Sequence, residues 1–282
     1  MARIDLHIHS TASDGRLSPA EVVHKSAELG LTIIAITDHD SVEGIAPALA
    51  AAKAFPQLRV IPNVEISTDV PQGEVHVLGY FIDYTDHELK ATLERMRNSR
   101  QERARGMVTK LQNLGVHIDW QRVREIAGSG SIGRPHIAQA MLEKGYIASV
   151  KEAFTKYIGR DGPAYVEREK RTPAEAVELI LRAKGLPVLA HPFTASDPEV
   201  LVAELKAAGL IGIEAYYDGY TRDEINRLVA LANKHNLIAT GGSDYHGLDT
   251  ATETMIGGVD VPMEAAERLI ALAEQRAPKQ AS

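Results

Sequence analysis

The fold is indicated by residues 2–39, ARIDLHIHSTASDGRLSPAEVVHKSAELGLTIIAITDH. Two runs rich in isoleucine, ARIDLHIH and TIIAITDH, flank a stretch with helical spacing that opens at Ser18-Pro19-Ala20-Glu21. Serine caps a helix, proline takes its first turn, and glutamate can reach back to the cap. These residues therefore predict a strand–helix–strand unit, the repeat from which parallel sheets are built.

The same alternation continues along most of the chain. Further strands are predicted at RVIPNVEIS (59–67), EVHVLGYFI (74–82), LPVLAHP (186–192), IGIEAYY (211–217) and LIATGGSD (237–244), which makes seven in all. Helices are predicted near 43–54, 86–113, 172–185, 197–208, 221–235 and 262–276, and Thr172-Pro173-Ala174-Glu175 repeats the capping device. Between about residue 99 and residue 165 the alternation lapses, so we expect an inserted helical subdomain there.

Composition narrows the setting of this chain. With 282 residues, 44% hydrophobic and 24% charged, it can bury one large core. No apolar run approaches the roughly 20 residues of a membrane helix, and MARIDLHIHS lacks the apolar stretch of a secretory signal, so we expect a cytoplasmic location. Because there is no cysteine, any metal must be held by nitrogen and oxygen.

Nine side chains that can bind metal lie at predicted strand ends or in the loops beyond them: His7, His9, Asp14, His39, Glu65, His76, His191, Asp244 and His246. Imidazole and carboxylate together are ligands of zinc, manganese and iron, and nine groups are too many for one ion. His7 and His9 lie two residues apart on a strand, so their rings project from the same face. Glu65, expected to end its strand, has two oxygens and can bridge two ions. The sequence therefore predicts a multinuclear metal cluster.

Taken singly, these residues also have ordinary structural interpretations. His7 and His9 fit a solvated sheet end, Asp14 precedes glycine in a common turn pair, and His76 fits a cross-strand pair. Their combination favours the metal site, because functional groups gather at the carboxyl ends of strands in parallel α/β barrels. The other histidines are expected to be solvated: His24, His87, His117 and His235.

Residues next to the candidate ligands have predicted supporting roles. Asp38 and Asp40 flank His39 and are expected to cap a helix or to orient a ligating ring. Gly241 and Gly242 precede Asp244 and are expected to let the backbone approach closely.

These residues also carry a resemblance to a known family. DLHIHSTASDG, ITDHDSVEG, the VEIS glutamate, the EVHVLGY histidine, LAHP and GGSDYHG resemble, in order and spacing, the motifs of the polymerase and histidinol phosphatase (PHP) family. The likeness covers most of residues 1–90 and 172–260. It implies an α/β fold, a distorted (β/α)7 barrel of residues 1–98 and 166–282 with an inserted helical subdomain at 99–165, and up to three divalent ions. The implied ligand sets are His7, His9, Glu65 and Asp244; Glu65, His76 and His191; and Asp14, His39 and His246.

Within that family, the insertion with GRPHIAQAML and GRDGPAYV resembles the 3′,5′-nucleoside bisphosphate phosphatases, a branch that includes 5′-to-3′ exoribonucleases. The chemistry agrees, because paired ions lower the pKa of a bridging water and neutralise phosphoryl oxygens. No Walker loop and no Ser-His-Asp order outranks the metal site, so the expected nucleophile is metal-bound hydroxide and no side chain is assigned as catalytic. We expect two to three divalent ions, manganese first, with iron, zinc or magnesium as alternatives.

Substrate selection is expected to come from the insertion. Arg134 stands between a glycine and a proline, a stiff setting that suits a bidentate clamp on phosphate. With Ser129 and His136 it is expected to hold a 5′-phosphate while the metals attack the 3′-phosphate. The alternative is that Arg134 only begins a helix, because proline suits a first turn.

Three functions remain open on the sequence. The first is a phosphatase that converts adenosine 3′,5′-bisphosphate to AMP and phosphate, and the second is a 5′-to-3′ exoribonuclease on short 5′-phosphorylated RNA. The third is a noncatalytic binding module that metals merely stabilise. The formal charge of −7 and the lack of a basic tract favour small substrates. Expected partners are thus a small nucleotide and possibly short RNA, with no membrane and no obligate protein partner.

Overall fold

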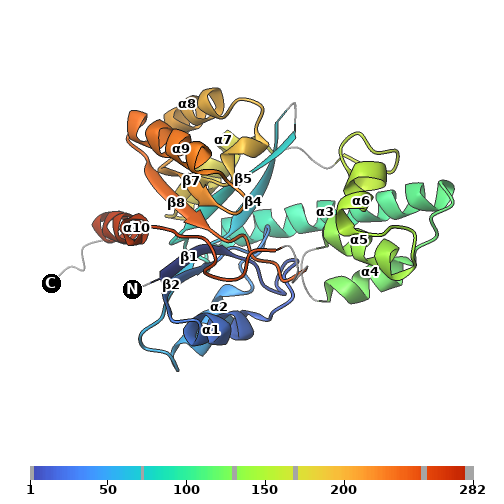
Figure 1. The fold of residues 1–282 in the computed structure, drawn as a ribbon, viewed down its shortest axis with the longest axis horizontal. Helices are drawn as coiled ribbons and strands as arrows, with labels where there is room; N and C mark the ends of the chain where they lie inside the picture. Colours follow the sequence, from blue (N-terminus) through green and yellow to red (C-terminus); the bar gives the residue numbers. More distant parts are fainter. Residues whose placement is uncertain (1–2, 71–72, 129–131, 168–170, 249–252, 277–282) are drawn as a thin grey trace.

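The structure is a computed structural model that describes residues 3–70, 73–128, 132–167, 171–248 and 253–276 (Figure 1). The described residues form eight strands: β1 (Arg3–Ile8), β2 (Leu31–Ile36), β3 (Arg59–Pro62), β4 (Glu65–Val70), β5 (Gly73–Tyr80), β6 (Leu186–Leu189), β7 (Gly212–Tyr217) and β8 (Ile238–Gly242). The α-helices are α1 (Pro19–Glu28), α2 (Ile45–Ala52), α3 (His87–Asn113), α4 (Trp120–Ala127), α5 (Arg134–Glu143), α6 (Val150–Ala153), α7 (Pro173–Arg182), α8 (Pro198–Ala208), α9 (Arg222–Lys234) and α10 (Met263–Arg276). The expected α/β fold is confirmed.

The capping signals in the sequence act as predicted. Ser18 accepts a hydrogen bond from the backbone N–H of Glu21, whose carboxylate accepts from the backbone N–H of Ser18 at 2.7 Å. Thr172 and Glu175 make the same reciprocal pair at the start of α7. These caps begin the helices at prolines and so fix where the preceding loops end.

The strands form two sheets, ordered β1-β2-β3 and β4-β5-β6-β7-β8. The predicted strand at 59–67 is broken after Pro62, so Glu65 begins β4 and does not end a strand. The uniformly parallel sheet was a wrong prediction, because β5 runs antiparallel to both β4 and β6. Only two residues separate Val70 from Gly73, and a parallel connection needs a crossover of a dozen or more.

Backbone hydrogen bonds join the two sheets at two places. Asp244 N–H, beyond β8, donates to the carbonyl of His7 at 2.9 Å, and Asp40 N–H, beyond β2, donates to the carbonyl of Glu65 at 2.9 Å. Between the sheets, Tyr80 donates its hydroxyl to the carbonyl of Leu6 within a buried apolar cluster. The described strands do not hydrogen-bond into one closed barrel, so the expected (β/α)7 barrel is found only as two sheets with helices outside them.

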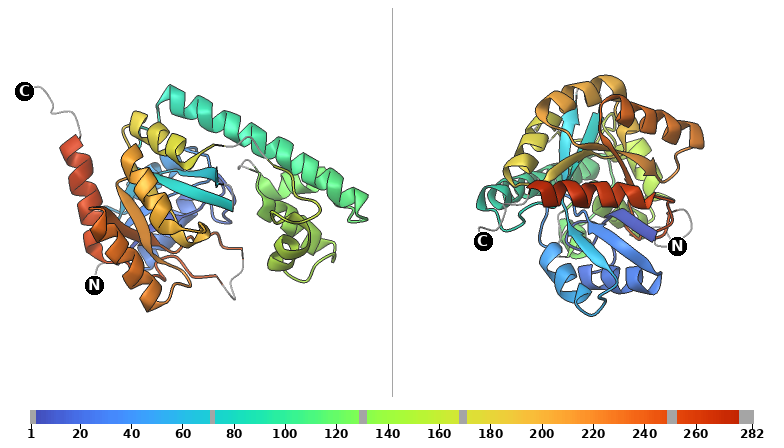
Figure 2. Two further views of the ribbon diagram at one scale, coloured as in Figure 1. Left: turned by 90° about the horizontal axis from the view of Figure 1, so that it is seen from above. Right: turned by 90° about the vertical axis from the view of Figure 1, so that its left-hand side faces the viewer.

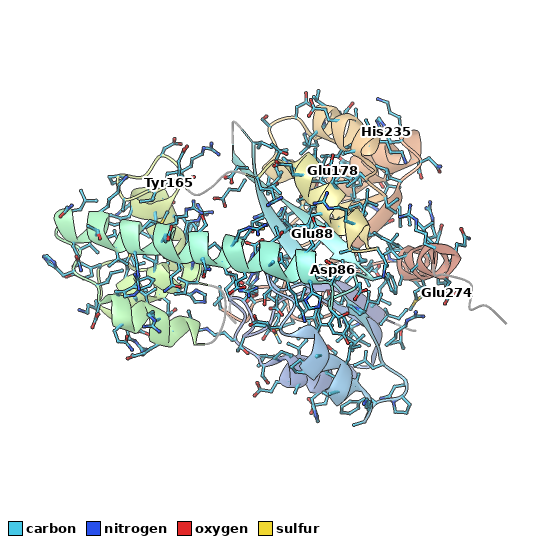
Figure 3. All side chains as sticks on the ribbon, turned by 180° about the vertical axis from the view of Figure 1, so that it is seen from behind. Asp86, Glu88, Tyr165, Glu178, His235 and Glu274 are labelled. Atoms are coloured by element: carbon cyan, nitrogen blue, oxygen red, sulfur yellow. The ribbon has the colours of Figure 1, made fainter. Side chains whose placement is uncertain are left out.

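Helix α3 leaves this body and carries a second group of helices (Figures 1 and 2). It is 27 residues long, about 40 Å at 1.5 Å per residue, and it runs without a break through the expected boundary at residue 98. Helices α4, α5 and α6 pack on its distal half around their own buried cluster, which includes Met107, Ile137 and Met141. Figure 3 shows Asp86 and Glu88 at the near end of α3 and Tyr165 beside the distal half. We call residues 104–166 the helical unit.

No helix in the described ranges combines the length and the apolar character needed to cross a membrane.

Candidate metal centre

The carboxyl end of β1 places the first two candidate ligands. His7 lies in β1 and His9 follows it, and both side chains are fully buried. Their Nε2 atoms converge on Asp244 beyond β8, whose Oδ1 lies 3.1 Å from His7 Nε2 and 3.0 Å from His9 Nε2. The close approach expected of the glycines is found at Gly242, where an added Cβ would lie 2.5 Å from the Cβ of His7.

The carboxylate of Glu65 faces rings from four different segments. Its Oε2 lies 3.2 Å from His9 Nε2 and 3.0 Å from His39 Nδ1. Its Oε1 lies 2.8 Å from His76 Nδ1 and 3.1 Å from His191 Nε2. Because Oε2 also lies 3.5 Å from His7 Nε2, it faces three imidazoles while Oε1 faces two others, an arrangement in which one carboxylate can bridge two ions.

A third group of ligand atoms surrounds Asp14, in the turn that follows β1. Asp14 Oδ1 lies 3.5 Å from His246 Nε2, and its Oδ2 lies 3.9 Å from His39 Nε2. The rings of His9 and His246 stack with their centroids 4.0 Å apart. With this group, the nine residues named from the sequence lie together in one site, whereas His24, His87 and His117 are exposed on helices or loops elsewhere.

The residues fit divalent cations by their geometry and chemistry. Their ligand atoms form three groups within which all atoms lie within 4.8 Å of one another: His7, His9, Glu65 and Asp244; His39, Glu65 and His76; and His9, Asp14, His39 and His246. Five of these atoms are buried and make no hydrogen bond: His7 Nε2, His9 Nε2, Asp14 Oδ1, His39 Nδ1 and Glu65 Oε2. Buried polar atoms normally have hydrogen-bond partners. Converging nitrogen and oxygen atoms that lack them suit manganese, iron, zinc or magnesium.

Burial and charge set the protonation of these groups. Burial acts to raise the pKa of Glu65, but His39 and His76 hold it well below its usual range. Burial lowers the pKa of His39 to about 4. Burial also acts to lower the pKa of His9, yet Asp244 and Glu65 outweigh it and raise that pKa to about 10. At neutral pH the His39 ring is therefore neutral and ready to bind a cation, whereas the His9 ring must first lose a proton.

A pocket extends from this cluster to the helical unit. It contains about 640 Å³ of empty space, including the open solvent at its mouth. Its lining includes four of the candidate ligands, Asp14, His39, His76 and His246, and four other charged residues, Glu74, Arg100, Arg103 and Arg134. The pocket thus brings the three arginines and the cluster into one space.

Of the three residues expected to bind the second phosphate, the structure describes Arg134 and His136. Arg134 begins α5 and lines the pocket, with Nη2 donating to Glu74 Oε2 at 2.6 Å. His136 is buried, its Nδ1 accepts the backbone N–H of Gly133 at 2.9 Å, and it is not among the described residues that line the pocket. Ser129 lies outside the described residues.

Comparison with known proteins decides the family. The PHP domain model matches residues 5–182. The chain belongs to the PHP domain family. This PHP protein is 34% identical over 248 residues to a 5′-3′ exoribonuclease of Haemophilus influenzae, covering 86% of this chain and 90% of the relative. It is 34% identical over 251 residues to a 3′,5′-nucleoside bisphosphate phosphatase of Chromobacterium violaceum, covering 87% and 88%.

A solved structure supports the fold of this PHP protein along its length. It is that of a proposed metal-dependent phosphoesterase from Bifidobacterium adolescentis, with a TM-score of 0.87 and 26% identity, covering 99% of this chain and 98% of the other. The resemblance read from the sequence motifs is therefore confirmed at the level of the family.

One buried acid of this PHP protein was missed by the sequence analysis. Glu214, in β7, is fully buried, and its Oε1 lies 2.9 Å from His7 Nδ1. Its Oε2 accepts the backbone N–H of His191 at 2.9 Å. The available signal was an acid inside the apolar run IGIEAYY, because buried acids need partners. Tyr217, on the same strand, donates its hydroxyl to Asp244 Oδ2 at 2.8 Å.

The two acids beside His39 do not cap a helix. Asp38 accepts the hydroxyl of Ser13 at 2.8 Å, and that hydroxyl lies 3.4 Å from His9 Nδ1, so Asp38 supports His9 through Ser13. Asp40 accepts Arg100 Nε at 2.5 Å and so ties α3 to the strand ends. The predicted role in orienting a ligating ring therefore agrees with the contacts of Asp38.

Proposed function

We propose that this PHP protein is a metal-dependent phosphoesterase that hydrolyses the 3′-phosphate of nucleoside 3′,5′-bisphosphates, giving the 5′-monophosphate and phosphate. The observation that carries the proposal is that candidate metal ligands and three arginines line one and the same pocket. A substrate with two phosphates matches such a pocket, because one phosphate can meet the cations while guanidinium groups hold the other. The name of the Chromobacterium violaceum relative agrees with this substrate class.

We propose that the nine clustered residues hold two to three divalent ions, manganese first. Such ions would activate water and neutralise the phosphoryl oxygens. Glu65 would tie two ion positions together, because its two oxygens face different sets of imidazoles. Asp244 would be held in place by the Tyr217 hydroxyl, and His7 by Glu214. Hydrogen bonds of this kind fix the orientation of ligands.

The helical unit and the adjoining part of α3 are proposed to select the substrate. Together, residues 99–165 contribute Arg100, Arg103 and Arg134 to the lining of the pocket. Arg134 would hold the 5′-phosphate. Because Arg134 and the cations line different parts of the pocket, a substrate held in this way would present its 3′-phosphate to the cations. Binding both ends of a substrate converts binding energy into correct positioning of the scissile bond.

The second candidate is 5′-to-3′ exoribonuclease activity on short 5′-phosphorylated RNA. It is favoured by the open mouth of the pocket and by the name of the Haemophilus influenzae relative. The same cations could act on a phosphodiester. The net charge of −7 favours the small substrate over a long nucleic acid.

The deciding experiment is steady-state hydrolysis by the manganese-reconstituted protein. Adenosine 3′,5′-bisphosphate, adenosine 3′-monophosphate and a 5′-phosphorylated RNA trinucleotide are compared by kcat/KM, and the nucleoside products are identified. We expect the bisphosphate to be preferred and AMP to be its product. Preference for the trinucleotide would favour the exonuclease, and metal binding without hydrolysis of any phosphoester would leave only the noncatalytic module.

A further inference from the structure

We infer that Glu74 is a positioning residue that holds Arg103 and Arg134 together as one receptor for the phosphate remote from the cleaved bond. This inference rests on the proposed function and deepens it. It adds Arg103 as a second contact to that phosphate and gives an acidic residue a role in binding an anion.

Glu74 connects the strand of the metal cluster with the helical unit. It lies in β5 two residues before His76, so both side chains project from the same face of the strand. Its Oε1 accepts Arg103 Nη2 at 3.0 Å, and its Oε2 accepts Arg134 Nη2 at 2.6 Å. One carboxylate thus holds two guanidinium groups, one from α3 and one from α5, at the wall of the pocket.

Each of the two guanidinium groups also lies over an aromatic ring. Arg103 lies 5.0 Å from the centroid of Tyr165, and Arg134 lies 5.2 Å from the centroid of Phe154. Both rings belong to the helical unit, and Figure 3 marks Tyr165 there. Stacking of this kind fixes the plane of a guanidinium. The two planes are therefore set before any ligand arrives.

Donors remain on both arginines after these contacts are made. A guanidinium has five N–H groups. The hydrogen bonds of the described residues engage one N–H of Arg134, with Glu74, and two of Arg103, with Glu74 and the carbonyl of Val166. Both side chains line the pocket, so the remaining N–H groups are placed at its wall. A phosphate oxygen accepts such donors in short, charge-assisted bonds.

The charges explain why an acid belongs in this receptor. Two guanidinium groups held close together repel each other, and one carboxylate between them offsets that repulsion. The trio keeps a net charge of +1, which still attracts a phosphate. If Glu74 loses its charge, no group holds the two arginines together. Part of the free energy of substrate binding is then used to order their side chains.

The test compares two substrates that differ only in the remote phosphate. The kcat/KM of the manganese-loaded protein is measured on adenosine 3′,5′-bisphosphate and on adenosine 3′-monophosphate for Glu74→Gln, Arg103→Met and Arg134→Met. We expect each variant to lose about tenfold or more on the bisphosphate, mainly through KM, because charge-assisted bonds are lost. Activity on the 3′-monophosphate is expected to change less than twofold.

Matched controls separate this role from a merely structural one. Arg105 lies on α3 over the ring of Trp120 and does not line the pocket, so Arg105→Met removes an equivalent stacked arginine. Glu143 pairs with Arg122 on the helical unit, so Glu143→Gln removes an equivalent ion pair. Neither control is expected to change the ratio of the two activities. Equal losses of kcat/KM on both substrates in Glu74→Gln, or a lower KM for the bisphosphate in that variant, would overturn the inference.

A binding measurement keeps the inference separate from the proposed function. The affinity for 5′-AMP is measured by calorimetry, which requires no hydrolysis. We expect it to fall about tenfold or more in all three variants and to be retained in both controls. If the unaltered protein hydrolyses neither nucleotide, the proposed function fails, but the calorimetry still tests whether Glu74 organises a phosphate receptor. An affinity for 5′-AMP that is unchanged in Glu74→Gln would refute that role.

Discussion

At the scale of single residues, the contact between Glu214 and His7 explains how the His7 imidazole is oriented. When the His7 ring is neutral, as metal binding requires, the Nδ1 engaged by a buried carboxylate at 2.9 Å keeps the proton. Its Nε2, beside Asp244 and Glu65, then offers a lone pair to a cation. The sequence located His7 because of its spacing from His9, whereas Glu214 was lost in an apolar strand. Which acid contacts which imidazole depends on which strands are neighbours in the sheet, and no local sequence pattern contains that information.

Replacing Glu214 by glutamine should weaken metal binding. The amide keeps the shape but supplies no negative charge to the ring, and losses of such partners typically cost roughly 10- to 100-fold in metal affinity. Manganese retention is measured by competition with a chromogenic chelator, with Glu267→Gln on the exposed face of α10 as the control. Equal retention in both variants would contradict the role given to Glu214.

At the scale of helices and strands, local signals were reliable wherever the structure depends on neighbours in sequence. The helices expected near 172–185, 197–208 and 221–235 are found as α7, α8 and α9 with bounds shifted by at most three residues. The strand directions were not predictable in the same way. Apolar runs such as EVHVLGYFI indicate a strand but contain no signal for its direction, which the short connection from β4 imposes.

The capping pair at α7 offers a direct measurement at this scale. Thr172→Ala removes the hydroxyl that accepts the N–H of Glu175, and loss of such a cap costs about 1 kcal/mol. The free energy of unfolding is measured by urea denaturation. Thr109→Ala, exposed near the carboxyl end of α3 but still inside the helix, serves as the control, because a threonine inside a helix supports no N-terminal cap. A loss no larger than that of the control would show that the cap contributes little.

At the scale of the whole molecule, the candidate site gathers residues from position 7 to position 246 of the chain. The sequence predicted this gathering from the rule that functional groups collect at strand ends, together with the family resemblance. It did not predict that the strands would divide into two sheets, because that division depends on the break between Pro62 and Glu65. Five buried nitrogen and oxygen atoms of the site make no hydrogen bond among the described residues, so cations that bind them should stabilise the fold itself.

Removing metal should therefore lower the melting temperature. A ligand that binds only the folded chain, at 100 times its dissociation constant, adds about 2.7 kcal/mol to the free energy of unfolding. Thermal unfolding is followed with manganese and then with excess chelator. Glu65→Ala, which lacks the carboxylate that faces five rings, is expected to show a smaller shift. An identical melting temperature in both conditions would mean that cations do not bind the cluster.

The unbroken course of α3 has an evolutionary consequence. Arg97, Arg100 and Arg103 recur every three residues and reach Asp40 and Glu74 from one side of the helix. A single inserted or deleted residue between Arg100 and Arg103 would rotate everything beyond it by about 100° and shift it by about 1.5 Å along the axis. Descendants of this chain can thus diversify their ligands by exchanging side chains, whereas changes of length in this stretch would be purged by selection.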